Sequence, residues 1–101
     1  MSYIVLLTDD AENDIDCSFM WYEIQKPNLG YDFINSIDRS LKTISQNPHT
    51  YPAVHKNVRR CVIKKFPFCI YYIAEDESKE VRVIAVFHNS RNPLVWKKRK
   101  Q

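Results

Sequence analysis

The feature that most constrains the fold is a change of hydrophobic period near the middle of the chain. Over residues 30–46, apolar side chains recur at helical spacing, at Ile34, Ile37, Leu41 and Ile44. From Tyr51 onward the sequence changes to short runs rich in Val, Ile, Phe and Tyr, which are typical of β-strands. Because the helical pattern precedes most of the strand pattern, the sequence predicts an α+β domain.

The helical part divides into two helices. Residues 10–26 carry apolar side chains at helical spacing, with Asp9 as the expected side-chain cap, and residues 27–30 interrupt the pattern. The second helix is expected over residues 30–46. Two helices joined by so short a loop form an antiparallel hairpin.

The strands are expected before and after this hairpin. The apolar run from Tyr3 to Thr8 predicts a first strand that is covered on both faces. Further strands are predicted over 58–66, 68–74 and 81–87, with room for a short strand over 53–57. In the strand over 81–87, one face is expected to carry Val81, Val83, Ala85 and Phe87. The expected order is β-α-α-β-β-β: an N-terminal strand, an α-helical hairpin and an antiparallel sheet of three to four strands, in a single domain over residues 1–101.

Composition excludes several classes of function. A single glycine, Gly30, argues against a Gly-rich phosphate-binding loop. The three cysteines lack metal or redox spacing, and the three histidines are scattered, so we expect free thiols, no metal site and no cofactor. No apolar run approaches the length of a membrane span, and no signal peptide is visible. These observations predict a cytoplasmic protein that does not enter a membrane.

Charge is divided unevenly along the chain. Residues 1–50 hold eight acids and three bases, whereas residues 51–101 hold four acids and twelve bases, a net charge of +8. Such asymmetry favours a polyanion or an acidic protein as the partner of the C-terminal half. The plainer interpretation is a solvated basic tail, since four of the bases lie in residues 97–100.

The C-terminal half also holds the residues that can carry chemistry. The candidates are Arg59, Arg60, Lys64, Lys65, Arg82, His88, Arg91 and Trp96. If the strands pair, some of these cations share one concave face and can hold phosphates, while Trp96 can stack on a base. For metal-free RNA cleavage, the catalytic candidates are His88, which can move protons, with Arg91 and Arg60. The remaining five residues are candidates for target binding.

Several short phrases occur in an order that resembles one known family. They are Trp21-Tyr22-Glu23, Leu29-Gly30, Asn47-Pro48, Tyr51-Pro52, Val58-Arg59-Arg60, the run from Phe66 to Tyr72, the run from Val83 to Val86, and His88-x-x-Arg91-x-Pro93-x-x-Trp96. In order and spacing they resemble the RelE/ParE toxin superfamily, over nearly the whole chain. The resemblance implies a toxin of a type II toxin–antitoxin system, and a β-α-α-β-β-β fold. It also implies a cognate antitoxin, usually acidic and partly disordered, that forms a hetero-oligomer with the toxin.

The resemblance leaves two mechanisms open. RelE-like members cut mRNA on the ribosome, and Arg59, Arg60 and Arg91 fall at or near their basic positions. ParE-like members inhibit DNA gyrase. Cys69 stands where a RelE-like nuclease carries an arginine, and the indole of Trp96 can only donate a hydrogen bond. We therefore expect a ParE-like inhibitor of growth, with the mRNA endoribonuclease as the alternative. An RNA-binding α+β module without toxicity is the alternative from another class.

Overall fold

The computed structural model describes residues 2–91 and residue 99. Within them the elements follow one another as β1 (Ile4–Leu7), α1 (Asp9–Gln25), α2 (Leu29–Gln46), β2 (Ala53–His55), β3 (Val58–Val62), β4 (Phe68–Glu75) and β5 (Glu80–His88). This order confirms the α+β class and the helical hairpin. The short strand β2 is present, whereas β3 ends at Val62 instead of continuing to residue 66.

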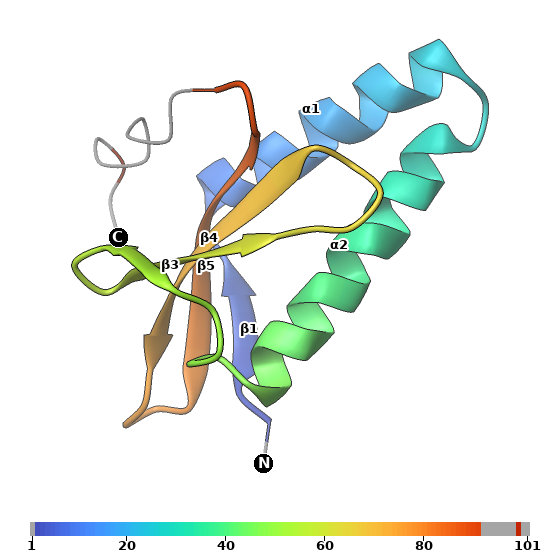
Figure 1. The fold of residues 1–101 in the computed structure, drawn as a ribbon. Coiled ribbons are helices and arrows are strands. Elements are labelled where there is room, and N and C mark those ends of the chain that lie inside the picture. The colour runs from blue at the N-terminus through green and yellow to red at the C-terminus, as the bar shows by residue number, and fades with distance from the viewer. Residues whose placement is uncertain (1, 92–98, 100–101) are drawn as a thin grey trace.

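The five strands form one sheet in the order β1-β5-β4-β3-β2. β1 lies parallel to β5, and the other neighbours are antiparallel. The helices α1 and α2 run side by side and cover one face of this sheet (Figure 1). The sheet is therefore mixed. The long connection between β1 and β5 allows β5 to lie beside β1 in the same direction.

The first helix begins one residue earlier than the sequence predicts. The cap is Thr8, whose hydroxyl accepts a hydrogen bond from the backbone N–H of Ala11 at 3.1 Å. Asp9 is instead the first helical residue, where its carboxylate lies at the positive end of the helix dipole. The assignment of the cap to Asp9 was wrong, because Thr8 offers the same type of acceptor one position earlier.

The two helices approach each other closely at Gly30. A Cβ atom at this position would lie 2.7 Å from the carbonyl oxygen of Phe19, which is too short for any other residue. The Glu23 carboxylate accepts hydrogen bonds from the backbone N–H groups of Gly30 (2.8 Å) and Asn28 (3.2 Å). Glu23 of the first helix therefore satisfies backbone donors at the start of the second.

The sheet face that packs against the helices, here called the helix face, holds the larger part of the core. Its buried side chains include Phe33, Ile37 and Ile44 of α2, and Cys61, Ile70, Tyr72, Val81 and Val83 of the sheet. The hydroxyl of Tyr72 donates to the carbonyl of Pro48 at 2.6 Å, so this buried polar group is satisfied. Among the described residues, no helix combines the length and apolarity needed to cross a bilayer.

The first strand is covered on one face only. Its side chains at Ile4 and Leu6 are 62% and 41% exposed, whereas Val5 and Leu7 pack against the core. The expectation of a strand covered on both faces was wrong, because β1 lies at the edge of the sheet and the helices reach only one side of it.

The other sheet face, here called the far face, has its own buried cluster of Val58, Cys69, Tyr71, Ile73, Ile84, Ala85 and Phe87. A β-bulge sets its composition, since Tyr71 pairs with Ala85 but Tyr72 pairs with Val83. The extra residue, Ile84, reverses the alternation along β5. Val81 and Val83 therefore lie on the helix face while Ala85 and Phe87 lie on the far face, and the expectation that all four share one face was wrong.

Candidate functional site on the far face

A small pocket lies on the far face where β3, β4 and the end of β5 meet. It has a volume of about 240 Å³ and is lined by Arg60, Val62, Cys69, Tyr71, Asn89 and Arg91. The strand register brings these residues together, because Arg60 pairs with Tyr71, and Cys69 with Phe87. We call this cavity the far-face pocket.

Two of the three catalytic candidates, Arg60 and Arg91, line this pocket together. Arg60 reaches it because successive strand residues point to opposite faces, so that Arg59 points to the helix face. Arg91 lies in the turn after β5, where its N–H donates to the carbonyl of His88 at 2.9 Å. Its guanidinium lies 4.1 Å from the ring centre of Phe87. The two guanidinium groups supply several donors to one small cavity.

The other polar groups of the far-face pocket are held in their neutral forms. Burial raises the pKa of the Cys69 thiol, although Arg60 acts in the opposite direction. The Cys69 sulfur donates a hydrogen bond to the side-chain oxygen of Asn89 at 3.0 Å. Burial also raises the pKa of the Tyr71 phenol. Thiol and phenol therefore stay protonated near neutral pH, and the pocket is suited to an anionic group such as a carboxylate or a phosphate.

The third catalytic candidate, His88, faces a different pocket. Its Nδ1 lies 3.0 Å from the backbone nitrogen of Ser90 and 2.7 Å from the Ser90 hydroxyl. Its ring packs edge-on against Phe68 of the helix face, with 5.3 Å between centres. There it lines a cavity of about 530 Å³ beside Trp21 and Tyr22. Arg91 links the far-face pocket to the surroundings of His88, because both residues line a third pocket of about 300 Å³.

The remaining binding candidates are dispersed. Arg59 donates to the carbonyls of Tyr51 (2.6 Å) and His49 (3.2 Å), and so fixes the segment before β2. Arg82 lies toward the other end of β5, where its guanidinium pairs with Glu75 at 2.8 Å.

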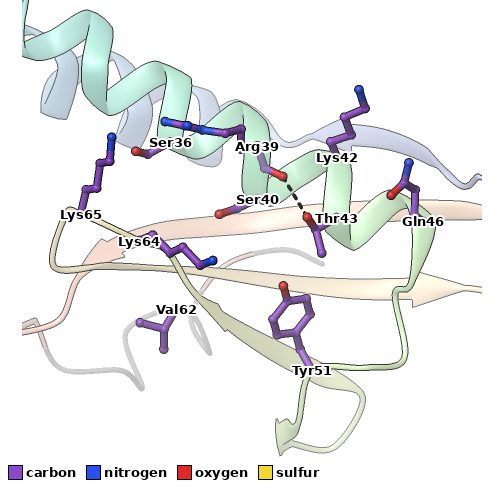
Figure 2. Close-up of a pocket in the computed structure, with 10 residues that line it drawn as sticks. All are labelled: Ser36, Arg39, Ser40, Lys42, Thr43, Gln46, Tyr51, Val62, Lys64 and Lys65. Atoms are coloured by element: carbon purple, nitrogen blue, oxygen red, sulfur yellow. Dashed lines mark hydrogen bonds between the residues drawn. The ribbon is translucent and has the colours of Figure 1, made fainter.

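Lys64 and Lys65 follow β3 and line a separate pocket against α2 (Figure 2). Trp96 lies outside the described residues. Of the candidates that the structure describes, it therefore brings Arg60 and Arg91 together in the far-face pocket and places the others elsewhere.

One buried polar cluster next to these pockets was missed at the level of sequence. Arg99 donates to both carboxylate oxygens of Asp14, at 2.7 and 3.0 Å, and to the carbonyl of Ile84 at 3.0 Å. Asp14 also accepts from the backbone N–H of Val86 at 2.9 Å. The pairing of β1 with β5 ends at Val83, and beyond it these bonds satisfy the carbonyl of Ile84 and the N–H of Val86. The hydrogen bonds that Arg99 donates to the Asp14 carboxylate raise the pKa of Arg99.

A signal for this cluster was present in the sequence. Asp14 lies three residues after the buried Ala11 and one before the buried Ile15, on the stripe of α1 that faces the core. An acid on such a stripe requires a partner, because a buried charge is stabilised only by pairing and hydrogen bonding. The Arg99 guanidinium lies 4.7 Å from the ring centre of Phe87, close to the position that Arg91 occupies.

Solved structures of several bacterial toxins share this fold. The chain is similar to a chain of the chromosomal ParDE toxin–antitoxin system of P. aeruginosa, with a TM-score of 0.74 and 18% identity over 86% of this chain and 96% of that one. It is similar to a chain of the E. coli RelBE toxin–antitoxin complex, with a TM-score of 0.69 and 15% identity over 89% of this chain and 100% of that one. It is also similar to the isolated E. coli RelE toxin, with a TM-score of 0.68 and 14% identity over 95% of this chain and 94% of that one. At these identities the likeness shows the fold alone. Among proteins with curated descriptions, none matches.

The strand order and the helical hairpin therefore define the small α+β fold that these solved structures from the ParDE and RelBE systems share. The sequence profile of the ParE toxin of the type II toxin–antitoxin system parDE matches residues 5–93. The chain belongs to this ParE toxin family.

Proposed function

We propose that the protein inhibits growth by binding DNA gyrase in the cytoplasm, and that a cognate antitoxin neutralises it. The observation that carries this proposal is the composition of the far-face pocket. Two guanidinium groups, Arg60 and Arg91, line it, while the thiol of Cys69 and the phenol of Tyr71 have raised pKa values. Such a pocket binds an anionic group well but offers poor proton acceptors near neutral pH. This arrangement favours binding over RNA cleavage.

The distribution of charge supports an acidic antitoxin. The C-terminal half carries a net charge of +8, and Arg60 and Arg91 belong to it. An acidic, partly disordered segment can wrap a basic surface of this kind, because complementary charge both steers the encounter and fixes the register. We expect the antitoxin to cover the far-face pocket and so to block the target.

The decisive experiment measures growth and gyrase activity together. Induction of the protein should arrest growth, and co-expression of the neighbouring antitoxin gene should relieve the arrest. The purified protein should inhibit supercoiling by gyrase and increase gyrase–DNA cleavage complexes. Arg60→Ala and Arg91→Ala should each weaken inhibition roughly tenfold or more, since each removes charge-assisted hydrogen bonds.

Arg82→Ala is the matched control, because Arg82 also lies on the far face but pairs with Glu75 outside the pocket. We expect it to inhibit gyrase as strongly as the unmodified protein. Undiminished supercoiling at saturating protein, despite growth arrest, would contradict gyrase as the target. If induction causes no arrest at all, the toxin proposal fails, and binding of RNA by the purified protein would support an RNA-binding α+β module without toxicity.

A second candidate function is ribosome-dependent cleavage of mRNA. The observation in its favour is that Arg91 lies between the far-face pocket and the pocket that contains His88. Two guanidinium groups could stabilise a phosphorane while His88 moves a proton. New 5′ ends in ribosome-bound mRNA after induction, lost in His88→Ala and in Arg91→Ala, would establish this function and displace the gyrase proposal.

A further inference from the structure

A second basic pocket lies between α2 and the segment that joins β3 to β4. It has a volume of about 490 Å³, and its lining residues are Ser36, Arg39, Ser40, Lys42, Thr43, Gln46, Tyr51, Val62, Lys64 and Lys65. Four of these side chains are cationic, and none of the lining residues is an acid. We call this cavity the α2 pocket. It is separate from the far-face pocket, with which it shares only Val62.

The groups at one end of the α2 pocket match a phosphate. Figure 2 shows Ser36 and Arg39 of α2 at this end, facing Lys65 of the segment after β3, with Lys64 next to Lys65 on that segment. A guanidinium offers paired donors to phosphate oxygens, and lysine supplies a compact charge that can sit beside them. Hydroxyl groups add further donors without adding bulk.

Ser36 is the observation that distinguishes this pocket from an ordinary basic surface. Its side chain lines the pocket although the residue is only 4% exposed, and its hydroxyl has no hydrogen-bond partner among the described residues. A buried hydroxyl without a partner costs about 1–3 kcal/mol. Folding alone would favour alanine here, because Ser36 lies inside α2, where alanine is the better helix former. A ligand oxygen would satisfy this hydroxyl.

Two side chains give the α2 pocket its apolar surface. Val62 is 57% exposed and lies near Lys64, whereas Tyr51, whose phenol pKa is raised by burial, lies at the end away from Ser36 and Lys65, opposite Thr43 (Figure 2). The Tyr51 ring can contact a flat heterocycle. A phosphate at one end and an aromatic ring at the other, in a cavity of this size, suit a small phosphate ester with a planar body.

We propose that the α2 pocket binds a nucleoside monophosphate unit, with the phosphate at Ser36, Arg39 and Lys65 and the base toward Tyr51. The unit is either a free nucleotide or the 5′ end of an oligonucleotide, since both present the same phosphate and base. This site is independent of the far-face pocket and of gyrase inhibition.

The test is a titration of the isotope-labelled full-length protein with AMP, inorganic phosphate and adenosine, followed by amide chemical shifts. AMP should cause saturable shifts within residues 36–46 and 62–65. Phosphate should shift the Ser36, Arg39 and Lys65 end alone, and adenosine should bind more weakly than AMP by about tenfold or more. A 5′-phosphorylated RNA dinucleotide that binds more tightly than AMP identifies a strand end as the source. Equal affinity identifies the free nucleotide.

Three variants make the titration specific. Arg39→Glu and Lys65→Glu should each weaken AMP binding by at least about tenfold, whereas Lys56→Glu, which reverses an exposed charge outside the pocket, should change the Kd less than twofold. Ser36→Ala should weaken AMP binding several-fold while Tm stays the same or rises. A purely structural hydroxyl would give the opposite pattern, with a lower Tm and unchanged affinity.

Several outcomes would overturn the proposal. One is the absence of saturable shifts up to about 10 mM AMP, the weak end of specific binding. Another is a set of shifts confined to the far-face pocket around Arg60 and Arg91. Binding of a glutamate-rich peptide in the α2 pocket, without binding of AMP, would assign the site to an acidic protein partner instead.

Discussion

The two faces of the sheet differ in what completes them. The helix face is covered by the chain's own helices, and Tyr22, Phe33, Phe66 and Phe68 interlock there at ring distances of 4.9–6.1 Å. On the far face, guanidinium groups of Arg91 and Arg99 lie over Phe87, and Arg60 lines a pocket. From this difference we expect the helix face to carry stability and the far face to carry the proposed target binding. Substitutions should therefore separate the two properties.

The largest loss of stability is expected at the centre of the aromatic cluster. Phe33 is fully buried, and Phe33→Ala should lower the free energy of unfolding by about 3–5 kcal/mol, because it removes apolar contacts and leaves a cavity. Urea denaturation measures this loss. Ile24→Ala, at a side chain that is 78% exposed, is the control and should cost less than about 1 kcal/mol. Similar losses in the two variants would contradict the role assigned to the helix face.

Asp14→Asn should have the next largest effect. The amide keeps an acceptor for the N–H of Val86 but removes the charge that pairs with Arg99, so we expect a loss of about 1–3 kcal/mol. Asp16→Asn, at an exposed neighbour on the same helix, is the matched control. Equal unfolding midpoints for the two variants would show that the Arg99 pair contributes nothing to stability.

Arg91→Ala sharpens the comparison from the far face. Arg91 is exposed, and its contact with the Phe87 ring is worth about 0.5–1 kcal/mol. Denaturation should therefore register a change no larger than this, while growth inhibition is largely lost. A variant that loses as much stability as Asp14→Asn would mean that Arg91 is a structural residue, and the separation of the two faces would fail there.

The smallest effect on stability is expected at Asp76, an exposed residue directly after β4 that contacts Tyr3 and His49. Its carboxylate accepts a hydrogen bond from the Tyr3 hydroxyl at 2.8 Å and lies 2.7 Å from Nε2 of His49. These two contacts, in that order, lower the pKa of Asp76 below its ordinary value of 3.8. Because the folded pKa is the lower one, the stabilisation is complete above the unfolded pKa and disappears as pH falls through the folded pKa.

Asp76→Asn should therefore reduce the acid dependence of Tm, measured between about pH 2 and pH 5. Glu77→Gln, at the exposed neighbouring position, should leave that dependence unchanged. An unaltered acid limb in Asp76→Asn would show that the contacts with Tyr3 and His49 do not form in solution.

Local pattern predicted the elements of this fold well. The helices expected over residues 10–26 and 30–46 are found at Asp9–Gln25 and Leu29–Gln46, because spacing and helix breakers lie close together in sequence. The parallel pairing of β1 with β5 was not predictable in the same way. An apolar run does not identify its partner strand, and the bulge at Ile84 depends on register with β4.

The candidate site was predictable only in part. The sequence named Arg60 and Arg91 as catalytic candidates and Arg59 as a binding candidate, but it did not show that the Arg59 guanidinium is held by the carbonyls of His49 and Tyr51. Strand alternation separates Arg59 from Arg60 once the register is known. The α2 pocket was missed because Arg39 of the helix and Lys65 of the later loop meet only in the folded chain.

The parallel pair of β1 and β5 has a consequence for synthesis of the protein. Leu7 pairs with Val83, so the first strand waits for nearly the whole polypeptide before its partner exists. At ordinary rates of translation this interval lasts roughly 4–15 s. During that time the segment Ile4–Leu7 has emerged from the ribosome without its partner strand, so its backbone hydrogen-bonding groups stay unpaired. The helical hairpin can already form, because its contacts are local. Among the described strands, β1 is therefore the first to be made, and its pairing must wait until β5 has been made.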